Sequence, residues 1–230
     1  MTNFIENSVF LGAVLSLVAY EAGMLLKRKF KLAIFNPLLI AILCVMGVLS
    51  LLGVDYDTYN EGGKYISYLL TPATVCLAVP LYRQMNLLKK NIKAVVLGIV
   101  SGVLASLVSV LALAWLFGLS HEEYVTLLPK SITTAIGMGV SEELGGIVTI
   151  TVAVIIITGV LGNMIAEAVC RIARINEPIA KGLALGTSAH AIGTAKALEM
   201  GEIEGAMGGL SIAVAGILTV IVAPIFSHII

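Results

Sequence analysis

Two segments of the chain combine hydroxyl groups, a cation and glycines in a way that favours binding of a small anion. The first, residues 130–143, is rich in small and hydroxyl residues and starts at Lys130. The second, residues 182–199, has the same character and contains His190. Neither is apolar enough to face lipid or polar enough to be an ordinary surface loop. The start of a helix offers free backbone N–H groups and the positive end of the helix dipole, which together attract anions.

Each segment has the sequence of a short helix that starts with a cap and is soon interrupted. In the first segment, Ser131 or Thr133 is the expected cap. The candidate substrate-binding residues are Lys130, Ser131, Thr133, Thr134, Thr187, Ser188, His190 and Thr194. The candidate hinges or helix breaks are Pro129, Gly137, Gly186 and Gly193. Together the two helix starts are expected to hold a small carboxylate from opposite sides.

The charged candidates also have simpler interpretations. Lys130 lies at the end of its segment, so its ammonium group either pairs with an anion or extends to the membrane surface. His190 either packs as a neutral hydrogen-bond donor or handles a substrate or a proton. Lys196 is expected to form an ion pair with Glu199, three residues further along the helix.

The sequence lacks the signatures of known catalytic and metal sites. It contains no HExxH, GxSxG, P-loop or GxGxxG motif. The three histidines, His121, His190 and His228, are far apart and have no cysteine or carboxylate at ligand spacing. The three cysteines are scattered, which argues against a disulfide framework and a CxxC metal site. We therefore expect a protein that is not an enzyme and that needs no cofactor or metal.

The composition of the chain predicts a membrane protein. Of its 230 residues, 59% are hydrophobic and 12% are charged, and 14 basic residues balance 14 acidic ones. Soluble domains carry roughly a quarter charged residues, so a soluble fold of this composition would expose too much apolar surface. The same figures exclude a disordered chain and a basic nucleic-acid-binding protein. The sequence predicts an all-α polytopic protein embedded in a lipid bilayer.

Six apolar runs are long enough to cross the hydrocarbon core, which needs about 20 residues. They are residues 8–26, 32–54, 65–82, 94–119, 144–169 and 207–230. We expect these six transmembrane helices plus two re-entrant or broken helical segments, residues 130–143 and 182–199. With one span between them, the two segments enter from opposite sides and meet near the middle of the membrane, as in the inverted repeats of secondary transporters. Ala135-Ile136-Gly137 and Ala191-Ile192-Gly193 align at one offset, which is consistent with such a repeat.

The distribution of basic residues predicts the orientation. Most of them follow the first, third and fifth runs, so by the positive-inside rule these three loops are cytoplasmic and the N-terminus is outside. The residues concerned are Lys27, Arg28, Lys29, Lys31, Arg83, Lys89, Lys90, Lys93, Arg171, Arg174 and Lys181. If residues 182–199 formed one full span, the C-terminus would lie inside; a hairpin places it outside. We expect a single transmembrane domain, with N-terminal helices in residues 1–119 and both polar segments in residues 120–230.

The motifs of the polar segments resemble those of the bacterial LrgB/CidB/YohK family. The matching stretches are Leu128-Pro129-Lys130-Ser131-Ile132-Thr133-Thr134, Glu143-Leu144-Gly145-Gly146 and residues 174–195, which contain Gly186-Thr187-Ser188-Ala189-His190-Ala191-Ile192-Gly193-Thr194-Ala195. The similarity covers nearly the whole chain, and the last stretch is highly specific. Ala135 and Val148 depart from the family pattern, which often has proline at these positions, and this predicts a less rigid first hairpin.

The resemblance implies a multi-pass protein of the bacterial plasma membrane with one of two functions. Members are named antiholin-like proteins and are linked, together with a small LrgA/CidA-type membrane partner, to regulation of murein hydrolase activity and cell lysis. Other members are linked to transport of small carboxylates such as pyruvate, glycolate or glycerate. Because the polar residues are concentrated in two interrupted helices, we favour transport. The alternative is an antiholin-like or holin-like regulator of lysis, and a homo-oligomer is compatible with either.

The transport hypothesis assigns a role to each hairpin. The carboxylate binds between the two helix starts, and His190 donates a hydrogen bond to it or carries a coupled proton. The hairpins then move together against the more uniform spans, which gives alternating access to the two sides of the membrane.

Overall fold

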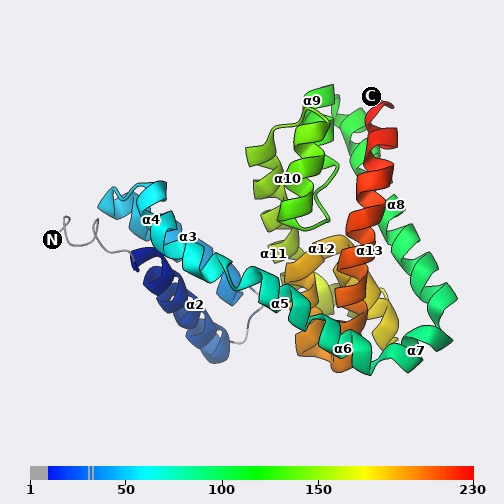
Figure 1. Ribbon diagram of the computed structural model, residues 1–230, viewed down its shortest axis with the longest axis horizontal. Coiled ribbons are helices and arrows are strands. Elements are labelled where there is room, and N and C mark those ends of the chain that lie inside the picture. The colour runs from blue at the N-terminus through cyan, green and yellow to red at the C-terminus, as the bar shows by residue number, and fades with distance from the viewer. Residues whose placement is uncertain (1–9, 31, 33) are drawn as a thin grey trace. The chain divides into compact units, whose positions relative to one another are not determined.

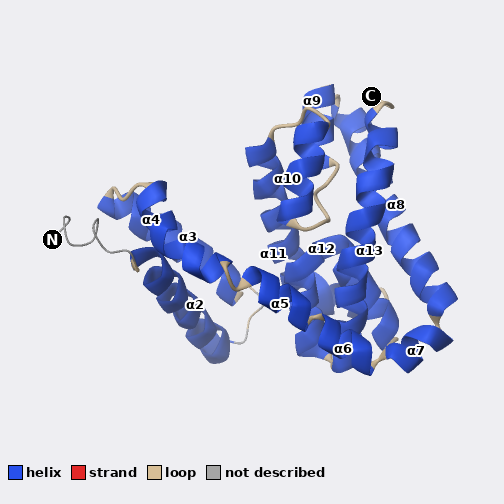
Figure 2. Cartoon of the chain, in the orientation of Figure 1, coloured by secondary structure: helices blue, strands red, loops and turns tan. Residues whose placement is uncertain are grey.

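The computed structural model is helical throughout and has no β-strand in its described residues, which are 10–30, 32 and 34–230 (Figures 1 and 2). The predicted all-α fold is confirmed. The chain divides into two compact units, one up to Cys76 and one from Leu77 onward, and each is described by itself. This boundary lies well before residue 119, where the sequence analysis divided the chain. Lys31 and the predicted external N-terminus, residues 1–9, fall outside the described residues.

The first unit contains helices α2 (Leu11–Phe30), α3 (Pro37–Leu52), α4 (Tyr56–Ser67) and α5 (Leu70–Cys76). The start of α3 is fixed by Asn36, whose Oδ1 accepts hydrogen bonds from the backbone N–H groups of Leu38 (2.9 Å) and Leu39 (3.2 Å). Pro37 occupies the first helical position, where no N–H partner is needed. The predicted runs 8–26 and 32–54 thus correspond to α2 and α3.

The third predicted run is an interrupted helix. Residues 65–82 cover the end of α4, all of α5 and most of α6 (Ala78–Arg83), with turns at residues 68–69 and at residue 77. Pro72 and Pro80 each lie in the first turn of a new helix, where proline costs no hydrogen bond. The two prolines therefore explain why this run is divided.

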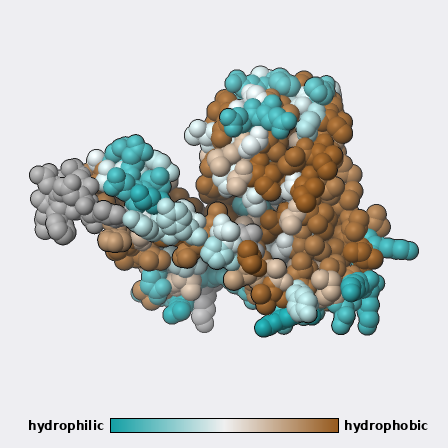
Figure 3. Space-filling model, viewed as in Figure 1, coloured by the Kyte–Doolittle hydropathy of each residue, from teal (hydrophilic) through white to brown (hydrophobic). Residues whose placement is uncertain are grey.

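The second unit is built from three long apolar helices, α8 (Ile92–Phe117), α11 (Val148–Ile172) and α13 (Glu202–Ser227), together with α6 and α7 (Met85–Lys90). Buried residues of α8 recur every three or four positions at Val95, Ile99, Val103, Leu107 and Val110, so one face of this helix packs on the core. On the face drawn in Figure 3, a hydrophobic band separates the polar ends of this unit, as expected for a surface in contact with lipid.

Four segments of the described chain are long and apolar enough to cross a membrane. They are residues 56–83, 92–117, 148–172 and 202–227. The helix α3 is apolar but has only 16 residues, and α2 carries Glu21 and three basic residues in its last turn. The protein is therefore polytopic, with about four long apolar helices and shorter ones beside them.

The first polar segment forms one side of a hairpin. The hairpin consists of α9 (His121–Leu127), a turn over residues 128–133, and α10 (Thr134–Glu143). A capping box joins Ser120 and Glu123 at the start of α9, and these hydrogen bonds hold the pKa of the Glu123 carboxyl below its usual value. The Tyr124 hydroxyl donates to the Phe226 carbonyl of α13 (2.9 Å). Gly137 faces the Ile155 side chain of α11, so α10 returns alongside α11.

The second polar segment is α12 (Pro178–Met200), which reverses direction inside the protein. Ala189 (φ −131°, ψ 19°) and His190 (φ 43°, ψ −136°) have non-helical backbone angles. Residues 178–188, the first arm, run alongside α13 in its own direction, because Gly182 contacts Met207 and Gly186 contacts Ser211. Residues 191–200, the second arm, run back along it, because Thr194 lies near Gly208 and Leu198 near Gly205. A single straight span is thereby excluded.

The two hairpins enter the second unit from opposite ends. Gly98 and Gly102 of α8 contact Leu183 and Thr187 of the first arm, so α8 and this arm start at the same end. We call this the basic end, because its loops carry Arg83, Lys89, Lys90, Lys93, Arg171, Arg174 and Lys181. The first hairpin and the C-terminus lie at the other end (Figure 1). The predicted arrangement of two oppositely directed re-entrant segments is confirmed.

Replacing Gly186 with alanine tests the packing of the second hairpin. The new methyl carbon would lie 2.5 Å from the Gly208 carbonyl oxygen and 2.6 Å from Ser211 Cβ. Overpacking of this kind costs about 1–3 kcal/mol, so we expect a lower unfolding temperature for the detergent-solubilised protein. Gly139→Ala is the control, because nothing lies within 4 Å of its Cβ position. Equal unfolding temperatures of the two variants would contradict the packing.

Candidate functional site

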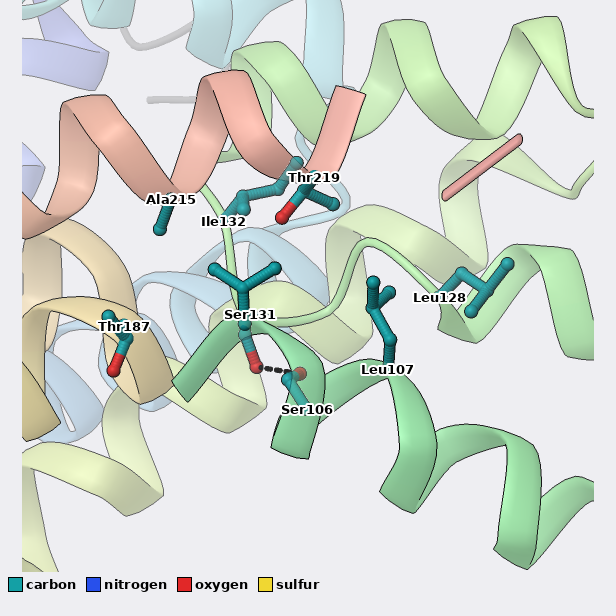
Figure 4. Close-up of a pocket in the computed structure, with 9 residues that line it drawn as sticks. Ser106, Leu107, Leu128, Ser131, Ile132, Thr187, Ala215 and Thr219 are labelled. Carbon is teal, nitrogen blue, oxygen red and sulfur yellow. Dashed lines mark hydrogen bonds between the residues drawn. The ribbon is translucent and has the colours of Figure 1, made fainter. Parts of the chain in front are cut away.

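The tip of the first hairpin and the first arm of the second meet at a small enclosed cavity. Its polar lining consists of Ser106 from α8, Ser131 from the first hairpin, Thr187 from α12 and Thr219 from α13 (Figure 4). The remaining lining residues are Val103, Leu107, Leu128, Ile132 and Ala215. Its volume of about 10 Å³ is room for the centre of about one water molecule. In this closed arrangement the cavity, which we call the tip cavity, is smaller than any carboxylate.

Lys130 does not line this cavity itself but is hydrogen-bonded to Ser131, which does. Its Nζ donates a hydrogen bond to Ser131 Oγ (2.9 Å), and its side chain is half-buried. This hydrogen bond holds the ammonium group at the tip of its own hairpin, and its extension to the membrane surface stays the alternative prediction. No carboxylate of the described residues lies within salt-bridge distance of Lys130. A half-buried cation without an acidic partner favours binding of an anion.

Ser131 has one hydrogen left to donate. Its Oγ accepts from Lys130 Nζ and from Ser106 Oγ, both at 2.9 Å (Figure 4). A hydroxyl oxygen has two lone pairs and one proton, so both lone pairs are occupied and the proton is available to an acceptor. The triad of Lys130, Ser131 and Ser106 therefore presents a donor beside the tip cavity.

The other candidates on the first hairpin lie around its tip but outside the cavity lining. Thr133 is the residue before α10 and has extended backbone angles, yet its side chain makes no capping hydrogen bond. Thr133 is therefore the N-cap residue, as one of the two predicted alternatives has it, but without the side-chain hydrogen bond of a cap, and Ser131 Oγ is engaged with Lys130 and Ser106. Thr133 and Thr134 are half-buried, and Pro129 is fully buried just after α9 ends.

Of the candidates on the second hairpin, Thr187 alone lines the tip cavity. Its Oγ1 donates to the Leu183 carbonyl of the same helix (2.8 Å). Ser188 is exposed, and its hydroxyl donates to the Ala184 carbonyl (2.7 Å), so it does not face the cavity as predicted. Thr194 is 1% exposed and packs near Gly208, and its Oγ1 has no hydrogen-bond partner among the described residues.

His190 lies at the reversal of the second hairpin and faces α11. Its Nε2 lies 2.9 Å from the Ile155 carbonyl oxygen, and the residue is 3% exposed. Because a carbonyl oxygen only accepts, Nε2 must carry the proton in this hydrogen bond. The ring is held against Gly159 of α11 and does not line the tip cavity. This position fits the packing interpretation, and handling of a substrate or a proton stays the alternative prediction.

The predicted breaks at glycine are wrong. Gly137 is inside α10, and its N–H donates to the Thr133 carbonyl (2.8 Å) as in a regular helix. Gly186 and Gly193 lie within the two arms of α12, and the reversal falls between them at residues 189–190. These glycines instead permit close contacts, since a methyl group on Gly193 would lie 2.6 Å from the Leu185 carbonyl oxygen of the other arm.

A cluster of ion pairs links the second arm of the second hairpin to α11. Lys196 Nζ lies 3.3 Å from a Glu199 carboxylate oxygen, which confirms the predicted pair. It also lies 2.6 Å from a Glu167 carboxylate oxygen of α11. Lys196 thus has two acidic partners, whereas Lys130 has none among the described residues.

Ser106 and Thr219 are the polar lining residues that are not among the predicted site residues. Each is one of three hydroxyl residues in a long apolar helix, where a hydroxyl commonly bonds its own backbone. A weak signal exists for Ser106, because it continues the spacing of Gly98 and Gly102 on one face of α8. Thr219 has no comparable signal.

The comparison with known proteins agrees with these features. A family model described as the LrgB-like family matches residues 16–229. The chain belongs to this family. An antiholin-like protein LrgB from Bacillus mycoides is 40% identical to this LrgB-like chain over 218 residues, 94% of this chain and 95% of the relative. A protein of the same name from Bacillus cereus is 39% identical over the same shares. No solved structure matches the chain.

The family match covers all the elements of the site. Residues 16–229 include both hairpins, the tip cavity and Lys130, so the predicted family is confirmed over the part of the chain that matters here. In the described part of this LrgB-like protein, no three His, Cys, Asp or Glu residues are grouped so that they could hold a metal ion. The polar groups that are present, an ammonium and hydroxyls, suit an anion.

Replacing His190 with alanine distinguishes a structural role in packing from a role in handling a substrate or a proton. The change removes a buried hydrogen bond and leaves space beside α11, which costs about 2–4 kcal/mol. We therefore expect a clear fall in the unfolding temperature of the solubilised protein. His228→Ala is the control, because His228 is exposed at the end of α13. If His190→Ala kept full stability and lost only a transport activity, the ring would act on substrate or proton instead.

Proposed function

We propose that this protein transports small carboxylates such as pyruvate or glycolate across the bacterial plasma membrane. One observation carries the proposal: Lys130, which has no acidic partner among the described residues, hydrogen-bonds Ser131 at a cavity with four hydroxyl residues in its lining, between two hairpins that enter from opposite ends. An ammonium group and a free hydroxyl proton provide charge-assisted hydrogen bonds to a carboxylate. The start of α10, three residues after Ser131, adds the positive end of a helix dipole.

Transport also accounts for the closed state of the tip cavity. Alternating access needs a state in which the site is sealed from both sides, and a cavity of about 10 Å³ is compatible with such a state. Opening requires the hairpins to move against α8 and α13. By the positive-inside rule we propose that the basic end faces the cytoplasm, and the sequence predicts an N-terminus on the outside. A small LrgA/CidA-type membrane protein is the proposed partner, and carbon flux through the pair would affect autolysis indirectly.

A second candidate function is regulation of murein hydrolase activity and lysis without transport. The observation that favours it is the name of the relatives, antiholin-like protein. The two functions differ in what crosses the membrane. A carrier gives saturable flux of one class of small anion, whereas a holin-like pore releases large solutes without saturation.

Uptake into proteoliposomes tests the proposal. The purified protein, with and without an LrgA-type partner, is given labelled pyruvate or glycolate under an imposed pH gradient. We expect saturable uptake and no release of a large trapped dye. Dye release without saturable uptake would support the holin-like candidate, and the absence of both would favour a regulatory role.

Lys130→Met tests the observation on which the proposal rests. Loss of a charge-assisted hydrogen bond of about 1.5–3 kcal/mol weakens carboxylate binding by roughly tenfold to a hundredfold. We expect the apparent substrate affinity in the uptake assay to fall accordingly, and Lys130→Arg to retain part of it. Lys93→Met removes the same charge from an exposed position at the start of α8 and serves as the control. Equal affinities in the two methionine variants would remove Lys130 from the binding site.

A further inference from the structure

A groove runs between α8 and the first arm of the second hairpin. Its volume is about 670 Å³, and it begins at the basic end beside Asn91 and Glu177. It extends along α8 as far as Ala105, about 20 Å from Asn91 at 1.5 Å per residue. Much of its wall consists of small residues: Ala94, Gly98, Gly102, Ala105, Ala180 and Ala184. Because these side chains are short, the two helices leave space between them.

Thr187 lies at the inner end of this groove and also lines the tip cavity. The side chain packs directly on α8: a methyl group on Gly102 would lie 2.6 Å from Thr187 Oγ1 and 3.0 Å from its Cβ. One turn earlier, Leu183 packs on Gly98 in the same way, at 2.8 Å. The groove and the tip cavity are therefore separated at one place by the side chain of Thr187.

We propose that this groove is the route by which a small anion reaches the tip cavity from the basic end, and that Thr187 packed on Gly102 is its inner gate. The identity of the anion rests on the proposed function, but the position of Thr187 between groove and cavity does not. Removing or moving one side chain joins the two spaces. A displacement of the first arm away from α8 would do the same.

The charges around the groove suit this direction of entry. The loops at the basic end concentrate lysine and arginine, which raises the local concentration of anions. Glu177 at the mouth is the one acidic residue in the lining of the groove, and no acidic residue lines it further in. The polar lining residues beyond the mouth, Ser101 and Thr187, are uncharged hydroxyls. Beyond Glu177, an anion moving inward along the groove therefore meets no acidic side chain before it reaches Lys130.

Cysteine labelling tests the route without requiring transport. In a full-length variant whose own cysteines are replaced, Ala105→Cys puts a thiol in the groove, and Leu104→Cys puts one at the same depth on the exposed apolar face. A sulfonate-bearing thiol reagent reacts with a hydrated thiolate and does not enter hydrocarbon. From the basic side we expect Ala105→Cys to react at least about tenfold faster than Leu104→Cys. Equal rates would overturn the route.

A second set of variants tests the gate. Ala215→Cys or Thr219→Cys reports on the tip cavity, where both residues are buried. Adding Thr187→Ala should raise labelling from the basic side about tenfold or more, whereas Thr187→Val, which keeps the size of the side chain, should not. Unchanged labelling with Thr187→Ala in both reporters would overturn the gate.

The outcomes separate this inference from the proposed function. Sidedness is fixed by a cysteine at exposed Ala173, in the loop between α11 and α12. If Ala105→Cys reacts as expected and its modification blocks carboxylate uptake, route and transport are both supported. If it reacts as expected while no variant takes up carboxylate, the route stands and the transport proposal fails.

Discussion

The hydrogen bond from His190 to the Ile155 carbonyl fixes the point at which the second hairpin reverses, and the arrangement of the site depends on that point. A reversal at membrane depth is tolerated only where protein covers the exposed backbone groups. It also puts a residue other than glycine at a positive φ, at a cost of roughly 1–2 kcal/mol. Contacts with α11 and α13 on both arms compensate for this cost. Because the reversal falls at residues 189–190, Thr187 lies two residues before it and faces the tip of the first hairpin.

Much of this architecture could be predicted because membrane helices obey strict rules on polarity. Two stretches too polar for lipid and too apolar for water were identified as hairpins, and their opposite entry followed from the single span between them. Lys130, Ser131 and Thr187 were identified for the same reason: polar groups in such segments are costly unless they are used. The positions of the breaks were wrong because glycine serves two purposes. Gly186 and Gly193 permit close contacts, whereas the real reversal at His190 is imposed by tertiary contacts that no local pattern reveals.

The face of α8 that carries Gly98, Gly102 and Ser106 illustrates how one repeated spacing can serve packing and function together. Apolar side chains gain little from association in lipid, so helices there approach through small residues. The two glycines bring the first arm of α12 against α8, and the third position supplies a hydroxyl to Ser131. A sequence spacing that predicts only close packing thus also sets the width of the groove and the partner of Ser131. The residues of the facing helix decide whether a given position on this face of α8 serves close packing or supplies a hydrogen bond.

Both hairpins are attached to the same turn of α11. Gly137 of the first faces the Ile155 side chain, and His190 of the second is bound to the Ile155 carbonyl. Displacement of this turn therefore shifts both hairpins, and their movements are mechanically linked. A conformation with both hairpins withdrawn would have to break the two attachments at once, which makes it rare. If the protein transports solute as proposed, this shared attachment would keep the two hairpins from withdrawing together, and ionic current through the protein would then be negligible beside the exchange of solute.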